Sequence, residues 1–140
     1  MDQLLEYAGH HPWLAASAVA AGIAVLINEL RLRALSFAAL GPQDVIRLMN
    51  QGATLLDMRA QQEYSQGHIS GARHFDLGQL PNASDTLKRY KGKALILYCD
   101  RGSGAAAAVR ALTKQGFTKV FNLRGGIAAW RAENLPLARD

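Results

Sequence analysis

Residues 95–104, LILYCDRGSG, decide the fold of this chain of 140 residues. The first four form an apolar run with the length and composition of a buried β-strand. Cys99 follows, the only cysteine of the chain, and then a loop with two glycines. The alanine-rich residues 105–114 predict a helix after the loop. We therefore expect a strand, a glycine loop and a helix, with Cys99 where the strand meets the loop.

This arrangement favours chemistry at Cys99. The N–H groups of the loop and the positive N-terminal end of the helix would point at one spot and stabilise an anion there. The thiolate of Cys99 would be that anion. A lone cysteine is more often a small buried hydrophobic residue. Its place at a strand end, directly before Gly102 and Gly104, favours the reactive role.

Composition excludes several classes of protein. A single cysteine rules out an internal disulfide and a cysteine-based metal site, and it fits a reducing compartment. The net charge of +5 is spread along the chain without a basic stripe interleaved with aromatic residues, so we expect no nucleic-acid partner. No spacing of side chains suggests a metal site, and we expect no cofactor.

A second informative stretch, residues 14–27 (LAASAVAAGIAVLI), is apolar and uncharged. Pro12 suits the first turn of a helix, and Trp13 suits a membrane interface. A helix over residues 14–27 would be roughly 22 Å long, against a hydrocarbon core of about 30 Å. The leucines and snorkelling arginines of residues 30–33 can extend it. We interpret residues 12–33 as a single transmembrane anchor with a basic juxtamembrane segment.

Two other interpretations of this segment stay open. A secretory signal has a positive start, whereas Asp2 and Glu6 make this one acidic, and no small-residue cleavage site follows the run directly. A buried helix of a soluble domain usually has a polar face, and this run has none.

The arginines predict the orientation of the anchor. Arg31 and Arg33 follow the run, and no lysine or arginine precedes it. The positive-inside rule then places the C-terminal part in the cytoplasm and the N-terminus outside. We expect an extramembrane segment over residues 1–11 and a soluble domain over residues 34–140.

The soluble domain alternates predicted strands and helices. We expect strands at residues 35–37, 54–57, 73–75, 95–98 and 120–123. We expect helices over residues 42–51, 58–64, 85–90, 105–114 and 126–130, with a turn at 67–72 and a loop at 80–81. This pattern predicts an α/β domain with a mainly parallel central sheet flanked by helices. Ligands bind beyond the carboxyl ends of such strands, where Cys99 falls.

Two motifs around Cys99 resemble the signatures of rhodanese-like domains. Residues 57–72, with Asp57-Met58-Arg59 and GHISGA at 67–72, resemble the first signature. Residues 116–130, ending in NLRGGIAAW, resemble the second. Cys99 lies between them, where the family keeps its catalytic cysteine. One anchor plus one such domain also resembles the bacterial membrane-anchored single-domain members, which implies the bacterial inner membrane.

The resemblance implies a sulfurtransferase that works through a persulfide. The thiolate of Cys99 would take the outer sulfur of thiosulfate or a persulfide donor and pass it to a thiol, or to cyanide in an assay. The substrate-binding loop would consist of Asp100, Arg101, Gly102, Ser103, Gly104 and Ala105. The expected partners are the sulfur donor, the thiol acceptor and the lipid bilayer. Gly22 and the alanines of the anchor would also permit a membrane-protein partner.

The loop departs from the family pattern at two positions. Family loops often carry a basic residue where this chain has Gly104, so a cation that would bind the anionic end of the donor is missing. Asp100 adds a negative charge that opposes thiolate formation, which Arg101 could offset. An alternative therefore stays open, a membrane-tethered protein-interaction module with little or no turnover. Phosphatase activity is not expected, because residues 104–108 hold only glycine and alanine and lack an arginine for phosphate.

Three further residues are interpreted as supporting the site. Asp57 and Arg59 would form a structural pair that ties a strand end to neighbouring loops. His68 resembles a packing and hydrogen-bonding residue of the family more than a catalytic base.

Overall fold

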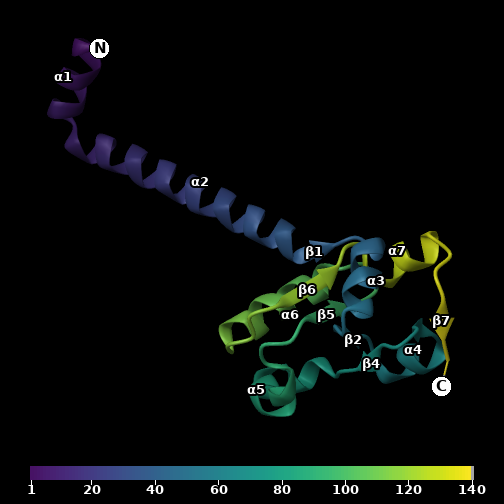
Figure 1. Ribbon diagram of the computed structural model, residues 1–140. Helices are drawn as coiled ribbons and strands as arrows, with labels where there is room; N and C mark the ends of the chain where they lie inside the picture. Colours follow the sequence, from purple (N-terminus) through teal and green to yellow (C-terminus); the bar gives the residue numbers. More distant parts are fainter. Residues whose placement is uncertain (140) are drawn as a thin grey trace. The chain divides into compact units, whose positions relative to one another are not determined.

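The computed structural model describes residues 1–139, and the side chains of all of these except residues 34–37. The chain divides into two compact units, Met1–Ser36 and Phe37–Asp140. The first contains α1 (Asp2–His10) and most of α2 (Pro12–Ala38), labelled in Figure 1.

One helical segment, Pro12–Arg33, is long and apolar enough to cross a membrane by length and composition. It has 22 residues and a mean hydropathy of 1.7, and it is about 33 Å long at the helical rise of 1.5 Å per residue. None of its most apolar window is buried inside the protein. This is not the burial expected of a core helix in a soluble domain.

The predicted strand over residues 35–37 is wrong. No glycine or proline interrupts residues 23–40, so α2 continues to Ala38 and the first strand is the two-residue β1 (Ala39–Leu40). The Gly41-Pro42 step then separates this strand from the next helix.

The second unit is built on a five-stranded sheet in the order β1-β6-β5-β2-β4, in which every pair of neighbours is parallel. Its other strands are β2 (Thr54–Asp57), β4 (Arg73–His74), β5 (Leu95–Tyr98) and β6 (Val120–Leu123). The short strands β3 (His68–Ile69) and β7 (Leu137–Ala138) form a separate antiparallel pair. The predicted mainly parallel sheet is confirmed, with β5 in its centre.

The described part of this unit has seven helical segments where five helices are predicted, and several bounds differ. They are α3 (Pro42–Asn50), α4 (Gln61–Gln66), η1 (Leu77–Asn82), α5 (Ala83–Thr86), η2 (Lys88–Tyr90), α6 (Ser103–Lys114) and α7 (Gly126–Ala132). The helix predicted from residue 58 begins only at Gln61. The loop expected at residues 80–81 lies in a 3₁₀ helix, and the turn expected at 67–72 contains β3.

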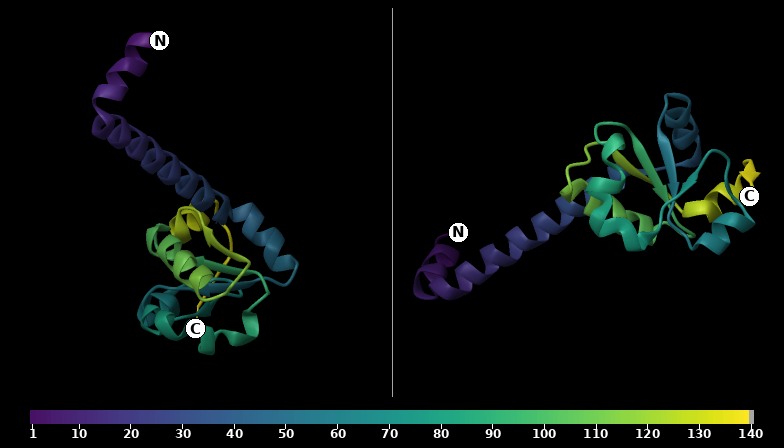
Figure 2. Two further views of the ribbon diagram at one scale, coloured as in Figure 1. Left: turned by 90° about the vertical axis from the view of Figure 1, so that its left-hand side faces the viewer. Right: turned by 90° about the horizontal axis from the view of Figure 1, so that it is seen from below.

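Helices cover both faces of the sheet, as Figure 2 shows. In β5, Leu95 and Leu97 pack with residues of α5 and α6. Ile96 and Tyr98 face the other way and pack with residues of α3 and α7. All four are fully buried, which explains why this strand is a continuous apolar run without alternation.

The parallel register brings chemistry-bearing residues to one edge of the sheet. Asp57 at the end of β2 is paired with Tyr98 at the end of β5. Cys99 follows directly, so it lies at the carboxyl edge of the central strand.

Candidate active site

Cys99 lies between the end of β5 and the start of α6 and is partly buried. The backbone N–H of Gly102 donates a hydrogen bond to its Sγ atom at 3.1 Å. Gly102 has φ +97°, a left-handed conformation that glycine adopts without strain. The loop therefore turns back on the sulfur, as expected for a loop that stabilises a thiolate or a persulfide anion.

The first residues of α7 hold this loop in place. The N–H of Ile127 donates to the carbonyl of Cys99 at 2.9 Å, and the N–H of Ala128 donates to the carbonyl of Asp100 at 3.2 Å. Gly126 allows this approach: it has φ +60°, and a Cβ there would overlap the carbonyl oxygen of Cys99 and lie 2.6 Å from that of Asp100. The GG of the second motif thus supports the position of Cys99 through close backbone packing.

Gly104 leaves the sulfur open on the side of α6. A Cβ at this position would lie 3.8 Å from Sγ of Cys99, an ordinary van der Waals contact. A longer side chain at position 104 would therefore begin beside the sulfur, and glycine keeps that space free.

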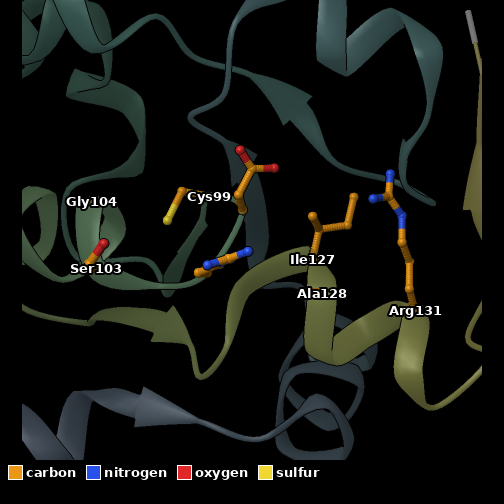
Figure 3. Close-up of a pocket in the computed structure, with 8 residues that line it drawn as sticks. Cys99, Ser103, Gly104, Ile127, Ala128 and Arg131 are labelled. Atoms are coloured by element: carbon orange, nitrogen blue, oxygen red, sulfur yellow. The ribbon is translucent and has the colours of Figure 1, made fainter.

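An open cleft of about 690 Å³ adjoins Cys99 (Figure 3). Its lining residues come from the loop and from α7: Cys99, Asp100, Arg101, Ser103, Gly104, Ile127, Ala128 and Arg131. Five of the predicted loop residues, counting Cys99, are thus brought together at one cleft. The other two, Gly102 and Ala105, are buried and do not line it.

Sequence reasoning missed the lining contributed by α7. Ile127 and Ala128 belong to the second family motif, and Arg131 lies one residue beyond the predicted helix. Arg131 follows Ile127 by four residues and Ala128 by three, so it neighbours both on the surface of a helix, and this spacing is the signal in the sequence. It became useful only when the position of that helix beside Cys99 was known.

The cleft carries three charged side chains. Asp100, Arg101 and Arg131 are all exposed and line it. The loop lacks a cation at position 104, as expected, but two arginines reach the cleft from other positions.

The predicted pair of Asp57 and Arg59 is buried and salt-bridged, with 2.8 Å between Oδ2 and Nη2. Arg59 also donates to the carbonyl of Gly67 at 2.6 Å. The hydroxyl of Tyr98 donates to Asp57 at 2.7 Å and accepts the N–H of Ile69 at 3.1 Å. These bonds tie the ends of β2 and β5 to the segment around β3.

Two pKa values in this group are displaced. Burial, together with the hydrogen bond to Asp57 and its charge, raises the pKa of Tyr98 far above its usual value. Burial lowers the pKa of Arg59, but the hydrogen bond and charge of Asp57 outweigh it, so that this pKa is raised. Arg59 therefore remains a cation and Tyr98 a neutral phenol at neutral pH.

His68 is buried and belongs to the packing of this region. Its Nδ1 lies 2.9 Å from the carbonyl oxygen of Tyr64, and its ring stacks on that of Tyr64 with 3.9 Å between centroids. Neither His68 nor the Asp57–Arg59 pair lines the cleft. Within residues 1–139, no group of three or more His, Cys, Asp or Glu side chains is placed to hold a metal ion.

Comparisons with known proteins identify the family. Residues 41–133 match the Rhodanese-like domain. The uncharacterized protein YibN of Escherichia coli (strain K12) is 30% identical over 141 residues, covering 99% of each chain. The thiosulfate sulfurtransferase GlpE of Stutzerimonas stutzeri (strain A1501) is 35% identical over 98 residues, covering 68% of this chain and 85% of that one.

Solved structures agree with these matches. The crystal structure of a thiosulfate sulfurtransferase from Pseudomonas aeruginosa aligns with 72% of this chain at 28% identity and a TM-score of 0.64. This chain spans only 19% of the length of that protein. With the fold, the two motifs and the family match in agreement, the chain belongs to the rhodanese-like domain family.

Proposed function

We propose that this protein is a membrane-anchored sulfurtransferase that carries sulfane sulfur as a persulfide on Cys99. The donor is thiosulfate or a small persulfide, and the acceptor is a thiol. Relatives named thiosulfate sulfurtransferase support the reaction class.

The observation that carries this proposal is the environment of the Cys99 sulfur. Sγ lies at an open cleft and accepts the N–H of Gly102 at 3.1 Å, beside the first turn of α6. An N–H donor aimed at a sulfur lowers the energy of its anionic form. A persulfide is also an anion, so the same donor stabilises the intermediate.

The chemistry needs two displacements at sulfur. First, the thiolate of Cys99 attacks the outer sulfur of thiosulfate, the sulfur–sulfur bond of the donor breaks, and sulfite leaves with the electron pair. Then an acceptor thiolate attacks the outer sulfur of the persulfide, and the thiolate of Cys99 leaves. Cyanide can replace the thiol and leaves as thiocyanate. No external oxidant or reductant is required.

The proposed location is the bacterial inner membrane, with residues 12–33 as a single-pass anchor, the N-terminus outside and the domain in the cytoplasm. The support is the length and hydropathy of Pro12–Arg33 and the arginines at its C-terminal end. A reducing cytoplasm would also keep Cys99 available as a thiol.

Intact mass spectrometry tests the first half-reaction. The full-length protein in detergent is incubated with thiosulfate, beside the variant Cys99→Ser. We expect a gain of one sulfur, about 32 Da, only when Cys99 is present, and its loss after cyanide is added.

The opposite result has a clear meaning. If neither thiosulfate nor glutathione persulfide adds sulfur to Cys99, the sulfurtransferase proposal is wrong. The domain would then be better described as a protein-interaction module held at the membrane.

A further inference from the structure

The cleft at Cys99 is larger than thiosulfate requires. Its volume of about 690 Å³ lies within the range of roughly 300–1,000 Å³ found for sites that bind drug-sized molecules. A water molecule occupies only about 30 Å³ of liquid, so a small inorganic anion would leave most of the cleft empty. A second, longer ligand therefore fits the same space.

The cleft has two chemically different ends. At one end, the N–H of Ile127 donates a hydrogen bond to the carbonyl of Cys99, which holds the start of α7 beside Cys99. Arg131 lies one turn further along α7, about 6 Å in helical rise from Ile127. Figure 3 shows Ile127 between Cys99 and Arg131, with both side chains of α7 on the same side of the helix. A nucleophilic sulfur thus lies at one end and a guanidinium group at the other, with an apolar side chain between them.

The charge of Arg131 is available to a ligand. The side chain is exposed and forms no salt bridge with any carboxylate in the described residues 1–139. Arg59, in contrast, is bound by Asp57. The lining contains one carboxylate, Asp100, and two guanidinium groups, Arg101 and Arg131, so its formal net charge is one positive. A planar guanidinium binds a carboxylate with two parallel hydrogen bonds.

We propose that Arg131 selects the sulfur acceptor, and that this acceptor is a thiol of low molecular weight that carries a carboxylate. Its thiol reaches Cys99, its carboxylate binds Arg131, and its carbon chain lies along Ile127. This inference rests on the proposed sulfurtransferase function. Arg131 touches the acceptor away from the reacting sulfur, so it determines specificity and takes no part in bond breaking.

The positive charge also suits the transfer step itself. The acceptor thiol loses its proton to solvent, and its thiolate attacks the outer sulfur of the anionic persulfide. Two negative groups therefore approach each other. A cation at the far end of the cleft reduces the repulsion for acceptors that bring a further negative charge.

The test uses two acceptors of nearly equal size and different charge. Full-length protein in detergent is loaded with thiosulfate, and sulfur transfer to glutathione and to glutathione diethyl ester is followed. We expect the wild type to have a lower KM for glutathione, and Arg131→Glu to raise that KM by about five- to tenfold with little change for the ester.

Arg110→Glu is the matched control, since Arg110 is an exposed arginine of α6 outside the cleft and its replacement changes the net charge equally. Equal KM values for the two acceptors in the wild type, or equal effects of the two variants, would overturn the role of Arg131. Absence of transfer to every acceptor, cyanide included, would instead refute the sulfurtransferase function.

Discussion

Tyr98 precedes Cys99, the proposed nucleophile, in the chain, and its side chain lies on the opposite side of the strand from that of Cys99. Its hydroxyl joins the carboxylate of Asp57 to the N–H of Ile69. Cys99 packs instead against the core cluster on the α5 and α6 side of the sheet. Successive side chains of a strand alternate between faces, so one residue stabilises the strand end while the next lines the cleft.

The Tyr98 hydroxyl should give this protein a measurable alkaline instability. Tyr98→Phe removes its hydrogen bonds, and we expect a loss of about 1–3 kcal/mol in the free energy of unfolding at pH 8. The pKa of Tyr98 is raised in the folded protein, so its contribution is present below the unfolded value of about 10 and decreases as the pH rises above it. The difference between wild type and variant should therefore shrink above pH 10.

Urea unfolding of the full chain in detergent, followed by tryptophan fluorescence between pH 8 and 11, measures this difference. Tyr7→Phe, at an exposed tyrosine of α1, is the control. A gap between wild type and Tyr98→Phe that stays constant over this range would contradict the prediction.

Sequence reasoning at this scale worked for residues whose role is set by neighbours in the chain. Asp57 and Arg59 are two positions apart, and their pairing follows from a short local turn. The loop after Cys99 was also found, since its glycines follow a strand directly. Arg131 was missed because its place in the lining of the cleft comes from α7 packing against a loop some thirty positions earlier.

At the scale of elements, prediction also succeeded where the element's own residues determine its structure, and failed where distant segments do. The strands β2, β5 and β6 are four residues long and mostly buried, and the structure confirms their predicted bounds. The described strands β1, β3, β4 and β7 have only two residues each, too few for a periodic pattern, and of these only β4 lies within a predicted strand. They exist because longer partners or nearby segments supply hydrogen bonds, and this information is absent from their own residues.

The contact between α7 and the Cys99 loop should be sensitive to a single methyl group. In Gly126→Ala, the new Cβ would overlap the backbone of Cys99 and Asp100. We expect a loss of about 2–4 kcal/mol in the free energy of unfolding, from overlap and from the left-handed conformation together. Sulfur transfer should fall as well, because the loop must move.

Gly92→Ala separates these two causes. Gly92 has φ +81°, but a Cβ there would meet no atom within 4 Å, so this variant has the conformational strain without the overlap and should lose only about 1 kcal/mol. Urea midpoints of the two variants provide the comparison. Equal losses of unfolding free energy in the two variants would show that the close approach of α7 to the Cys99 loop does not contribute to stability.

At the scale of the whole molecule, the exposed apolar helix and the sheet domain favour different solvents. The window Pro12–Arg33 has no buried residues, and its apolar side chains have no polar face opposite them. Transfer of such a surface from water into lipid is strongly favourable. The helix predicted for this segment is confirmed by α2, and the membrane anchor stays a prediction from hydropathy and length.

Membrane insertion and orientation can be tested with Cys99, the single cysteine. In a bacterial host, the full-length protein should remain in the pellet after a carbonate wash, because a spanning helix resists extraction. A membrane-impermeant maleimide should label Cys99 in inverted vesicles and leave it unlabelled in intact spheroplasts. Labelling in detergent shows that the thiol is reactive.

Two other results would be decisive. Recovery of the full-length chain in the carbonate supernatant would refute the anchor. Labelling in intact spheroplasts would reverse the orientation predicted from Arg31 and Arg33.

If the proposed persulfide forms on Cys99, the solitary thiol at the end of β5 would also determine how long the protein holds the transferred sulfur. In proteins with a second, resolving cysteine, that thiol can attack the first and expel the bound sulfur as sulfide, closing a disulfide. This chain has no such internal release route. Its cargo can depart only when another molecule collides with the cleft, so the lifetime of the loaded form reports the local concentration of acceptors. The protein would thus store sulfane sulfur until an acceptor molecule reaches the cleft.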